Sequence, residues 1–177
     1  MTEDGVVWNQ LTALLPEAGA EEARDCWSLG EQEAALGLLV SGLMASQVPI
    51  GELVRAWISV LAEGWGEREA LTPRLRQCVG DGGPAPVRLV ADEEGAGGPR
   101  GGSADVLVPW IACERCGAVL ARVHAREPWG GLSYLAVKYV VAPAAGGGPV
   151  TREFPAESPD LAFTYLLEAC AARLPSG

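Results

Sequence analysis

The sequence predicts an α+β protein, with a bundle of about four helices in the N-terminal half and a small antiparallel sheet covered by a terminal helix in the C-terminal half. In the first 80 residues, apolar side chains recur every three or four positions. Beyond residue 104 they gather in short runs between Gly and Pro clusters. We therefore expect a helical domain over residues 1–80, a Gly/Pro-rich linker with a possible strand over 81–104, and a sheet with a C-terminal helix over 105–177.

Turn residues separate the apolar stripes of the N-terminal half. Pro16 ends the first stripe, and a short acidic segment, residues 21–27, precedes the second. Pro49 disfavours helical geometry at Val48, so a tight turn is expected there between two helices. Pro73 is best tolerated in the first turn of the last helix. The apolar stripes lie at residues 7–15, 36–44, 53–65 and 71–79.

The C-terminal half has the pattern of an antiparallel meander followed by a helix. The final helix should begin after Ser158 as N-cap, with Pro159 at its first position. Residues 95–103 are rich in Gly and are expected to form a mobile loop. The expected strands are residues 87–90, 106–111, 118–124, 132–141 and 150–154.

The charge of the chain is strongly acidic and unevenly distributed. Twenty-three acidic and 13 basic residues give a formal net charge of −10. Residues 1–80 hold 12 of the acids and five of the arginines. Such a surface repels nucleic acid and anionic lipid and favours a cationic partner, although a purely solubilising role fits the composition equally well.

The sequence carries no signal for export or membrane insertion. Its first residues, MTEDGVVWNQ, are acidic where a secretory signal is basic. The longest apolar stretches fall short of the roughly 20 residues that cross a bilayer. Five cysteines, an odd number, favour reduced thiols over a disulfide framework. A cytoplasmic protein is therefore expected.

A Cys-x-x-Cys motif, Cys113 and Cys116 followed by Gly117, has the shape of a metal-binding knuckle between two strands. A structural zinc site usually has four ligands, so this motif supplies half of one. The only histidine, His124, is a candidate third ligand, and Cys78 or Cys170 would have to complete the set. Two packed thiols, or the remnant of a lost site, are the alternatives to bound zinc.

Residue patterns do not indicate catalysis. A redox Cys-x-x-Cys usually opens a helix, whereas a strand-like run follows Cys116. For nucleophilic catalysis, His124 would have to meet Ser133 or Cys116 through tertiary folding that no local motif predicts. The Gly-rich segment at 95–102 lacks the Lys-Ser/Thr ending of a phosphate loop. We expect a protein without enzymatic activity.

The helical half resembles the Maf-type immunity proteins of bacterial polymorphic-toxin systems. The resemblance rests on WSLGEQEAALGLLV at residues 27–40, VPIGELVRA at 48–56 and LAEGWG at 61–66. These segments give a Gly-Glu-x-Glu-x-Ala-Leu start, an apolar helix, a Val-Pro-Ile turn and a second helix. The resemblance covers roughly residues 25–70, carries over no catalytic residue, and implies a small cytoplasmic protein that binds and blocks a cognate toxin, often a nuclease.

Charge and resemblance together give a binding hypothesis. A toxin that acts on nucleic acid tends to be basic, so an acidic inhibitor is attracted to its substrate groove. The main alternative is a zinc-knuckle-containing binding or regulatory module, and an enzyme ranks third. The candidate partner-binding residues, chosen by charge and position, are Glu31, Glu33, Glu52, Glu63, Glu67 and Glu69.

Overall fold

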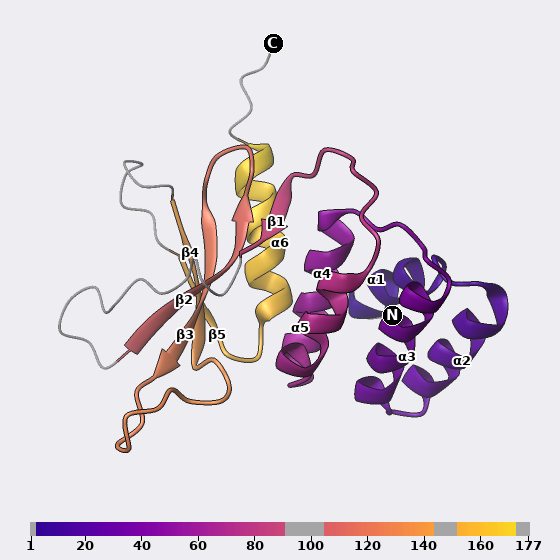
Figure 1. The fold of residues 1–177 in the computed structure, drawn as a ribbon. Coiled ribbons are helices and arrows are strands. Elements are labelled where there is room, and N and C mark those ends of the chain that lie inside the picture. The colour runs from indigo at the N-terminus through magenta and orange to yellow at the C-terminus, as the bar shows by residue number, and fades with distance from the viewer. Residues whose placement is uncertain (1–2, 91–104, 144–151, 173–177) are drawn as a thin grey trace, which may run out of the picture. The chain divides into compact units, whose positions relative to one another are not determined.

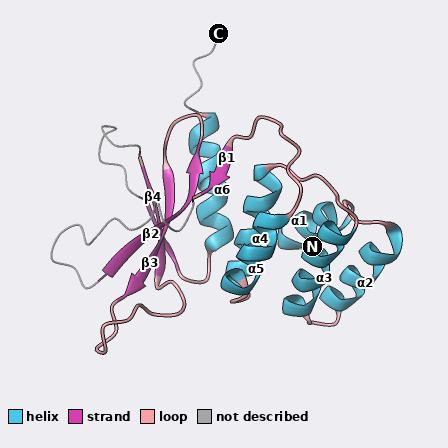
Figure 2. Ribbon diagram, in the orientation of Figure 1, coloured by secondary structure: helices cyan, strands magenta, loops and turns pink. Residues whose placement is uncertain are grey.

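A computed structural model describes residues 3–90, 105–143 and 152–172. The chain divides into two compact units, Met1–Pro84 and Ala85–Gly177, and the division falls within the predicted linker at 81–104. The predicted mobile loop at 95–103 lies outside the described residues, as do the first two positions of the strand predicted at 150–154. The α+β class predicted from the sequence is confirmed (Figure 2).

The named elements of the first unit are all helices, as the apolar stripes predicted, and one isolated bridge joins Ile50 to Gly80. One helix, α2 (Glu17–Ser28), was not among those predicted from the four stripes and lies in the acidic segment. Its inward-facing residues Ala20 and Ala23 are buried, and alanine has the highest helix propensity. It ends where Gly30 adopts a φ of +87°. The helices are α1 (Glu3–Thr12), α2 (Glu17–Ser28), α3 (Gln32–Ala45), α4 (Glu52–Gly64) and α5 (Arg68–Gln77) (Figure 1).

Apolar side chains of α3 and buried Trp8 belong to this unit's core, and Trp8 leads a chain of three tryptophan rings that reaches the surface at Trp65. Leu36, Leu39, Val40 and Leu43 of α3 are fully buried. The Trp8 and Trp27 rings stack with centroids 4.3 Å apart, and Trp65 meets Trp27 edge-on at 6.1 Å. Offset-stacked and edge-on aromatic pairs each contribute about 0.5–1.5 kcal/mol beyond burial of their surface. These tryptophans therefore join α1 and α2 to the end of α4.

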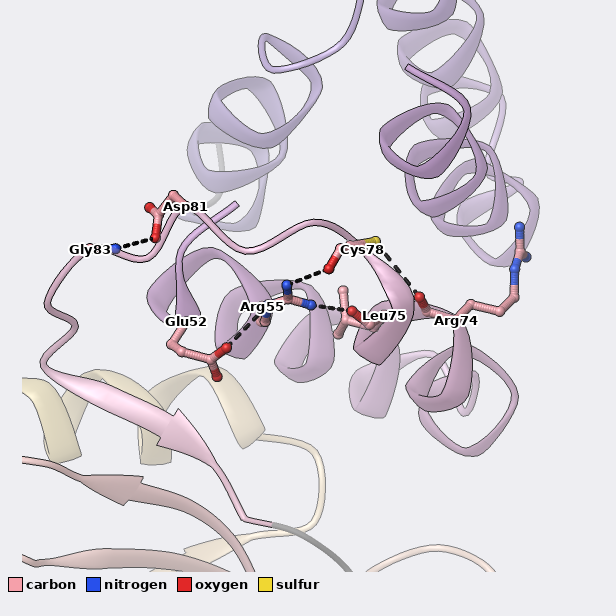
Figure 3. Close-up of polar contacts among 7 residues, drawn as sticks. All are labelled: Glu52, Arg55, Arg74, Leu75, Cys78, Asp81 and Gly83. Carbon is pink, nitrogen blue, oxygen red and sulfur yellow. Dashed lines mark hydrogen bonds and ion pairs between the residues drawn. The ribbon is translucent and has the colours of Figure 1, made fainter. Parts of the chain in front are cut away.

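A buried arginine connects α4 to the end of α5 (Figure 3). Arg55 is 7% exposed and donates hydrogen bonds to the backbone carbonyls of Leu75 and Cys78, the latter at 2.7 Å. Its Nε lies 3.1 Å from the carboxylate of Glu52, one turn earlier on α4. Carbonyls at a helix C-terminus lack intrahelical donors and carry partial negative charge, so the guanidinium caps α5.

The second unit is a five-stranded antiparallel sheet in the order β1-β2-β3-β4-β5, which is the predicted meander. Helix α6 (Pro159–Ala171) begins at Pro159, with Ser158 in the N-cap position as predicted, although the Ser158 side chain makes no capping hydrogen bond. The helix packs on strands β2 to β5 and buries Phe163 and Leu166. Figure 1 shows α6 lying along the sheet. The strands are β1 (Val87–Leu89), β2 (Asp105–Cys113), β3 (Val119–Ala125), β4 (Lys138–Ala142) and β5 (Arg152–Pro155).

Strand β4 begins later than the sequence predicted. Residues 132–141 were expected to be extended throughout, but the strand starts at Lys138. The Ser133 hydroxyl accepts a hydrogen bond from the Ala125 amide and donates one to the Leu135 carbonyl. Leu132 still forms an isolated antiparallel bridge with Arg126, but Tyr134 and Leu135 belong to no strand and are exposed.

No helix of the described residues combines the length and apolarity needed to cross a bilayer.

Replacing Arg55 by leucine should lower the free energy of unfolding by about 3 kcal/mol, because two hydrogen bonds from a charged donor are lost and the capped carbonyls stay buried. Glu52→Gln serves as the matched control. The Glu52 side chain is 42% exposed, so its removal should cost less than about 1 kcal/mol. Urea unfolding of both variants measures the difference. Equal midpoints would contradict the capping role.

Candidate metal centre and acidic surface

The Cys-x-x-Cys motif forms the tight turn between β2 and β3. Cys113 is the last residue of β2 and is buried. Its amide donates to the Ala118 carbonyl at 2.8 Å, and the Gly117 amide donates to the Cys113 carbonyl at 2.9 Å. Gly117 has a φ of +68°, which glycine adopts without steric cost. This turn directs Cys113 and Cys116 to the same place.

Cys170 from α6 completes a cluster of three thiols, which we name the thiol cluster: Cys113, Cys116 and Cys170. The three sulfur atoms all lie within 4.8 Å of one another. The Cys116 and Cys170 sulfurs are 2.9 Å apart, a hydrogen-bond contact well beyond the ~2.05 Å of a disulfide bond. Cys113 and Cys170 are buried and Cys116 is half-buried, so the cluster is reached from solvent beside Cys116.

The surroundings of Cys170 keep its thiol protonated. Burial raises the pKa of Cys170 well above its usual value, and hydrogen bonding and charge repulsion from Cys113 and Cys116 raise it further. Ionising the cluster would place negative charge in a small, partly desolvated volume. A metal cation bound between the sulfurs would compensate that charge. It would also favour the thiolate form of its ligands, because metal coordination deprotonates thiols.

The donor set and spacing suit a soft or borderline metal ion. Thiolates select ions such as Zn²⁺ over Mg²⁺ or Ca²⁺, which prefer oxygen ligands. With Zn–S bonds of about 2.3 Å in tetrahedral geometry, neighbouring sulfurs would be about 3.8 Å apart. The cluster, spanning 2.9–4.8 Å, brackets that separation. The cluster could therefore hold a metal ion.

The structure does not bring His124 to the thiol cluster. His124 pairs with Val106 at the opposite end of β3 from Val119, which pairs beside Cys113. Five residues of strand correspond to about 16 Å. The His124 Nδ1 lies 2.7 Å from the Ser133 carbonyl oxygen, within the loop before β4. The third thiol is instead Cys170, one of two cysteines that the sequence offered.

Cys78, the other cysteine considered as a ligand, lies at the end of α5 in the first unit. Its sulfur is 3.7 Å from the Arg74 carbonyl oxygen (Figure 3). Burial raises the pKa of the Cys78 thiol, and the charges of Arg55 and Arg74 only partly offset this effect. Cys78 therefore packs as a neutral thiol beside the Arg55 cap.

Three of the six glutamates predicted to bind a partner form ion pairs within the first unit. Glu52 pairs with Arg55, and Glu69 pairs with Arg68. Glu63, only 7% exposed, lies 3.0 Å from the Arg68 Nε. These carboxylates compensate buried guanidinium groups, which makes them less available to a partner.

The remaining predicted glutamates are differently placed. Glu67 lies half-buried at the start of α5, whereas Glu31 and Glu33 are exposed around the start of α3. The exposed acids of α2 precede them in the chain, and Glu17, Glu21 and Asp25 recur every four residues and so share one side of that helix. We name as the acidic surface the six exposed residues Glu17, Glu21, Glu22, Asp25, Glu31 and Glu33.

The α2 acids were not chosen from the sequence, because their segment was not assigned to a helix. Its alanine-rich, acidic composition provided the signal: Ala20 and Ala23, with acids between and around them, form an amphipathic pattern at helical spacing.

Comparisons with known proteins give no match: no protein-family model, no curated protein and no solved structure is significantly similar to this chain.

The neutral state of Cys78 predicts a pH dependence of stability. Its pKa is raised in the folded chain, while in the unfolded chain the thiol ionises near pH 8.5. Stability from this group is thus complete below that pH and declines as pH rises toward the folded pKa. Between the two pKa values, the free energy of unfolding of the parent should fall with pH by up to about 1.4 kcal/mol per pH unit more than that of the Cys78→Ala variant. Urea unfolding from pH 7 to 10 measures both slopes; parallel slopes would contradict the assignment.

Proposed function

We propose that this protein is a non-enzymatic, cytoplasmic binding protein of the immunity type, which neutralises a basic bacterial toxin, such as a nuclease, by direct contact. The observation that carries this proposal is the acidic surface. It concentrates exposed negative charge on α2 and the start of α3, and three of its residues, Asp25, Glu31 and Glu33, lie within the segment that resembles the Maf-type immunity proteins.

The charge balance of this segment supports a cationic partner. Residues 17–33 contain six acids and one arginine, a net charge of −5 out of −10 for the whole chain. The arginine, Arg24, directs its Nε to the Thr12 hydroxyl at 3.3 Å, toward α1. A concentrated field of one sign accelerates encounter with an oppositely charged protein and makes binding sensitive to salt.

The helical scaffold suits recognition that requires no chemistry. Leu36 and Leu39 of α3 and Ala20 and Ala23 of α2 are buried, so the acids project from elements anchored by packing. Rigid presentation lowers the ordering cost of association. On this proposal, inhibition requires occupation of the toxin's substrate groove and no bond-making by this chain.

Removing charge from the acidic surface should weaken capture of the partner at least tenfold. The test isolates the tagged protein from its native cytoplasm, identifies the bound protein, and measures affinity at two salt concentrations. The test variant combines Glu21→Gln, Asp25→Asn, Glu31→Gln and Glu33→Gln. Loss of affinity should be largest at low salt, because screening already weakens the interaction at high salt.

The control variants test whether affinity depends on where negative charge is removed or only on the net charge of the chain. Glu157 and Glu168 are exposed residues of the second unit, and Glu157→Gln with Glu168→Gln should leave affinity almost unchanged. Glu52→Gln should also bind normally, since Glu52 pairs with Arg55. A partner that is acidic, or one that binds all variants equally at both salt concentrations, would overturn the proposal.

The second candidate function is a zinc-containing binding or regulatory module in the second unit. The thiol cluster favours it, because three cysteine sulfurs from β2, the following turn and α6 converge. Neutral thiols are compatible with packing alone, whereas convergence of three on one point is typical of a soft-metal site.

Protein purified under reducing conditions should contain close to one zinc per chain, and Cys113→Ser should remove most of it. Elemental analysis measures this. Cys26→Ser is the matched control, because Cys26 lies on α2 in the first unit. Equal zinc contents in the parent and the Cys113→Ser variant would place any metal elsewhere.

A further inference from the structure

We infer that Cys113, Cys116 and Cys170 bind one Zn²⁺-class ion as a three-thiolate centre, and that this ion fixes the C-terminal end of α6 to the β2–β3 turn. The inference rests on the second candidate function and assigns to the metal a structural role within the second unit. It also replaces His124 with Cys170 in the ligand set predicted from the sequence.

The sequence separation of the ligands gives the site its structural consequence. Cys116 and Cys170 are 54 residues apart, and their sulfurs lie 2.9 Å apart. The ion would thus close a long loop that includes β3, β4 and β5. Closing such a loop removes conformational freedom mainly from the unfolded chain, and metal-binding free energy then becomes folding free energy.

The position of Cys170 shows which part of α6 depends on the site. Phe163 and Leu166 bury the earlier turns of the helix in apolar surroundings. Cys170 is the buried residue of the last turn, and α6 ends at Ala171. A terminal turn held by one small side chain unravels easily, because its last carbonyls lack intrahelical partners. Metal coordination at Cys170 would suppress that unravelling.

The turn between β2 and β3 provides a rigid base for the ion. The amides of Cys113 and Gly117 bond within the turn, and the Glu114 amide donates to the Pro86 carbonyl at 2.9 Å. The Glu114 carboxylate also lies 2.8 Å from the Arg88 Nε on β1. The two sulfurs of the motif are therefore positioned by the sheet before metal arrives, so that α6 is the element ordered by binding.

The fourth position of the ion is supplied from elsewhere. Within the described ranges, no further Cys, His, Asp or Glu joins the group of three. Tetrahedral zinc with three protein ligands takes water or another small donor in the remaining position. Half-buried Cys116 gives that position a path to solvent. An ion such as Zn²⁺ in this centre would therefore have three sulfur ligands from the protein.

The test uses the full chain, stripped of metal by a chelator and kept reduced with a phosphine. Titration with Zn²⁺ is followed by native mass spectrometry, and titration with Cd²⁺ by thiolate-to-cadmium charge-transfer absorption. One ion per chain is expected in both titrations, with no uptake of Mg²⁺. Hydrogen exchange should slow at least tenfold in peptides covering the last turn of α6 when Zn²⁺ is added. Exchange in α3 should stay unchanged.

Single variants assign the ligands. Cys113→Ser, Cys116→Ser and Cys170→Ser should each weaken Cd²⁺ binding at least a hundredfold, while Cys26→Ser and His124→Gln leave it intact. Because a serine variant can fail to fold, the exchange and cadmium measurements on the parent chain stand independently. Absence of metal uptake by the reduced parent would overturn this inference and the zinc-module function together. Uptake that leaves α6 exchange unchanged would overturn the inference alone, and neither result bears on the acidic surface.

Discussion

The antiparallel register between β2 and β3 is the constraint on which the second unit depends. Pairing of Ala112 with Val119 makes the six intervening residues a tight turn, which places Cys113 and Cys116 at one end of the sheet. The same register sends His124 to the other end, opposite Val106. Helix α6 packs along strands β2 to β5, which brings Cys170 to the turn. One pairing therefore determines which side chains of this unit can meet.

In the first unit, carboxylates serve two distinct purposes. Arg55 and Arg68 are buried, and a buried guanidinium needs both hydrogen-bond acceptors and negative charge nearby. Glu52, Glu63 and Glu69 meet that need. The acids of α2 remain exposed and give the unit its concentrated negative surface. Net charge alone cannot separate these groups, because the distinction arises only when the helices pack.

Local patterns predicted most of the fold. Helical spacing, Pro49 and the Ser158-Pro159 pair located α3, α4 and α6, since periodicity and capping depend on neighbouring residues. The late start of β4 was not predictable, because it depends on how the Ser133 side chain bonds with Ala125, eight positions earlier.

The candidate site was predictable only in part. Cys113 and Cys116 lie close in sequence, so their convergence follows from a local motif. The choice of Cys170 over His124 depends on strand register and helix docking, which no local pattern encodes. Likewise, Glu31 and Glu33 were placed on an exposed surface by charge alone, whereas the internal pairing of Glu63 required knowing the position of Arg68.

The tryptophan arrangement gives each unit its own optical behaviour. Trp8 and Trp27 stack at 4.3 Å in the first unit, close enough for their strong electronic transitions to couple and to produce a paired far-ultraviolet circular dichroism band. Trp110 of the second unit is 3% exposed, so its emission moves to longer wavelength when that unit unfolds. Spectroscopy can therefore follow the melting of one unit against the other without added labels.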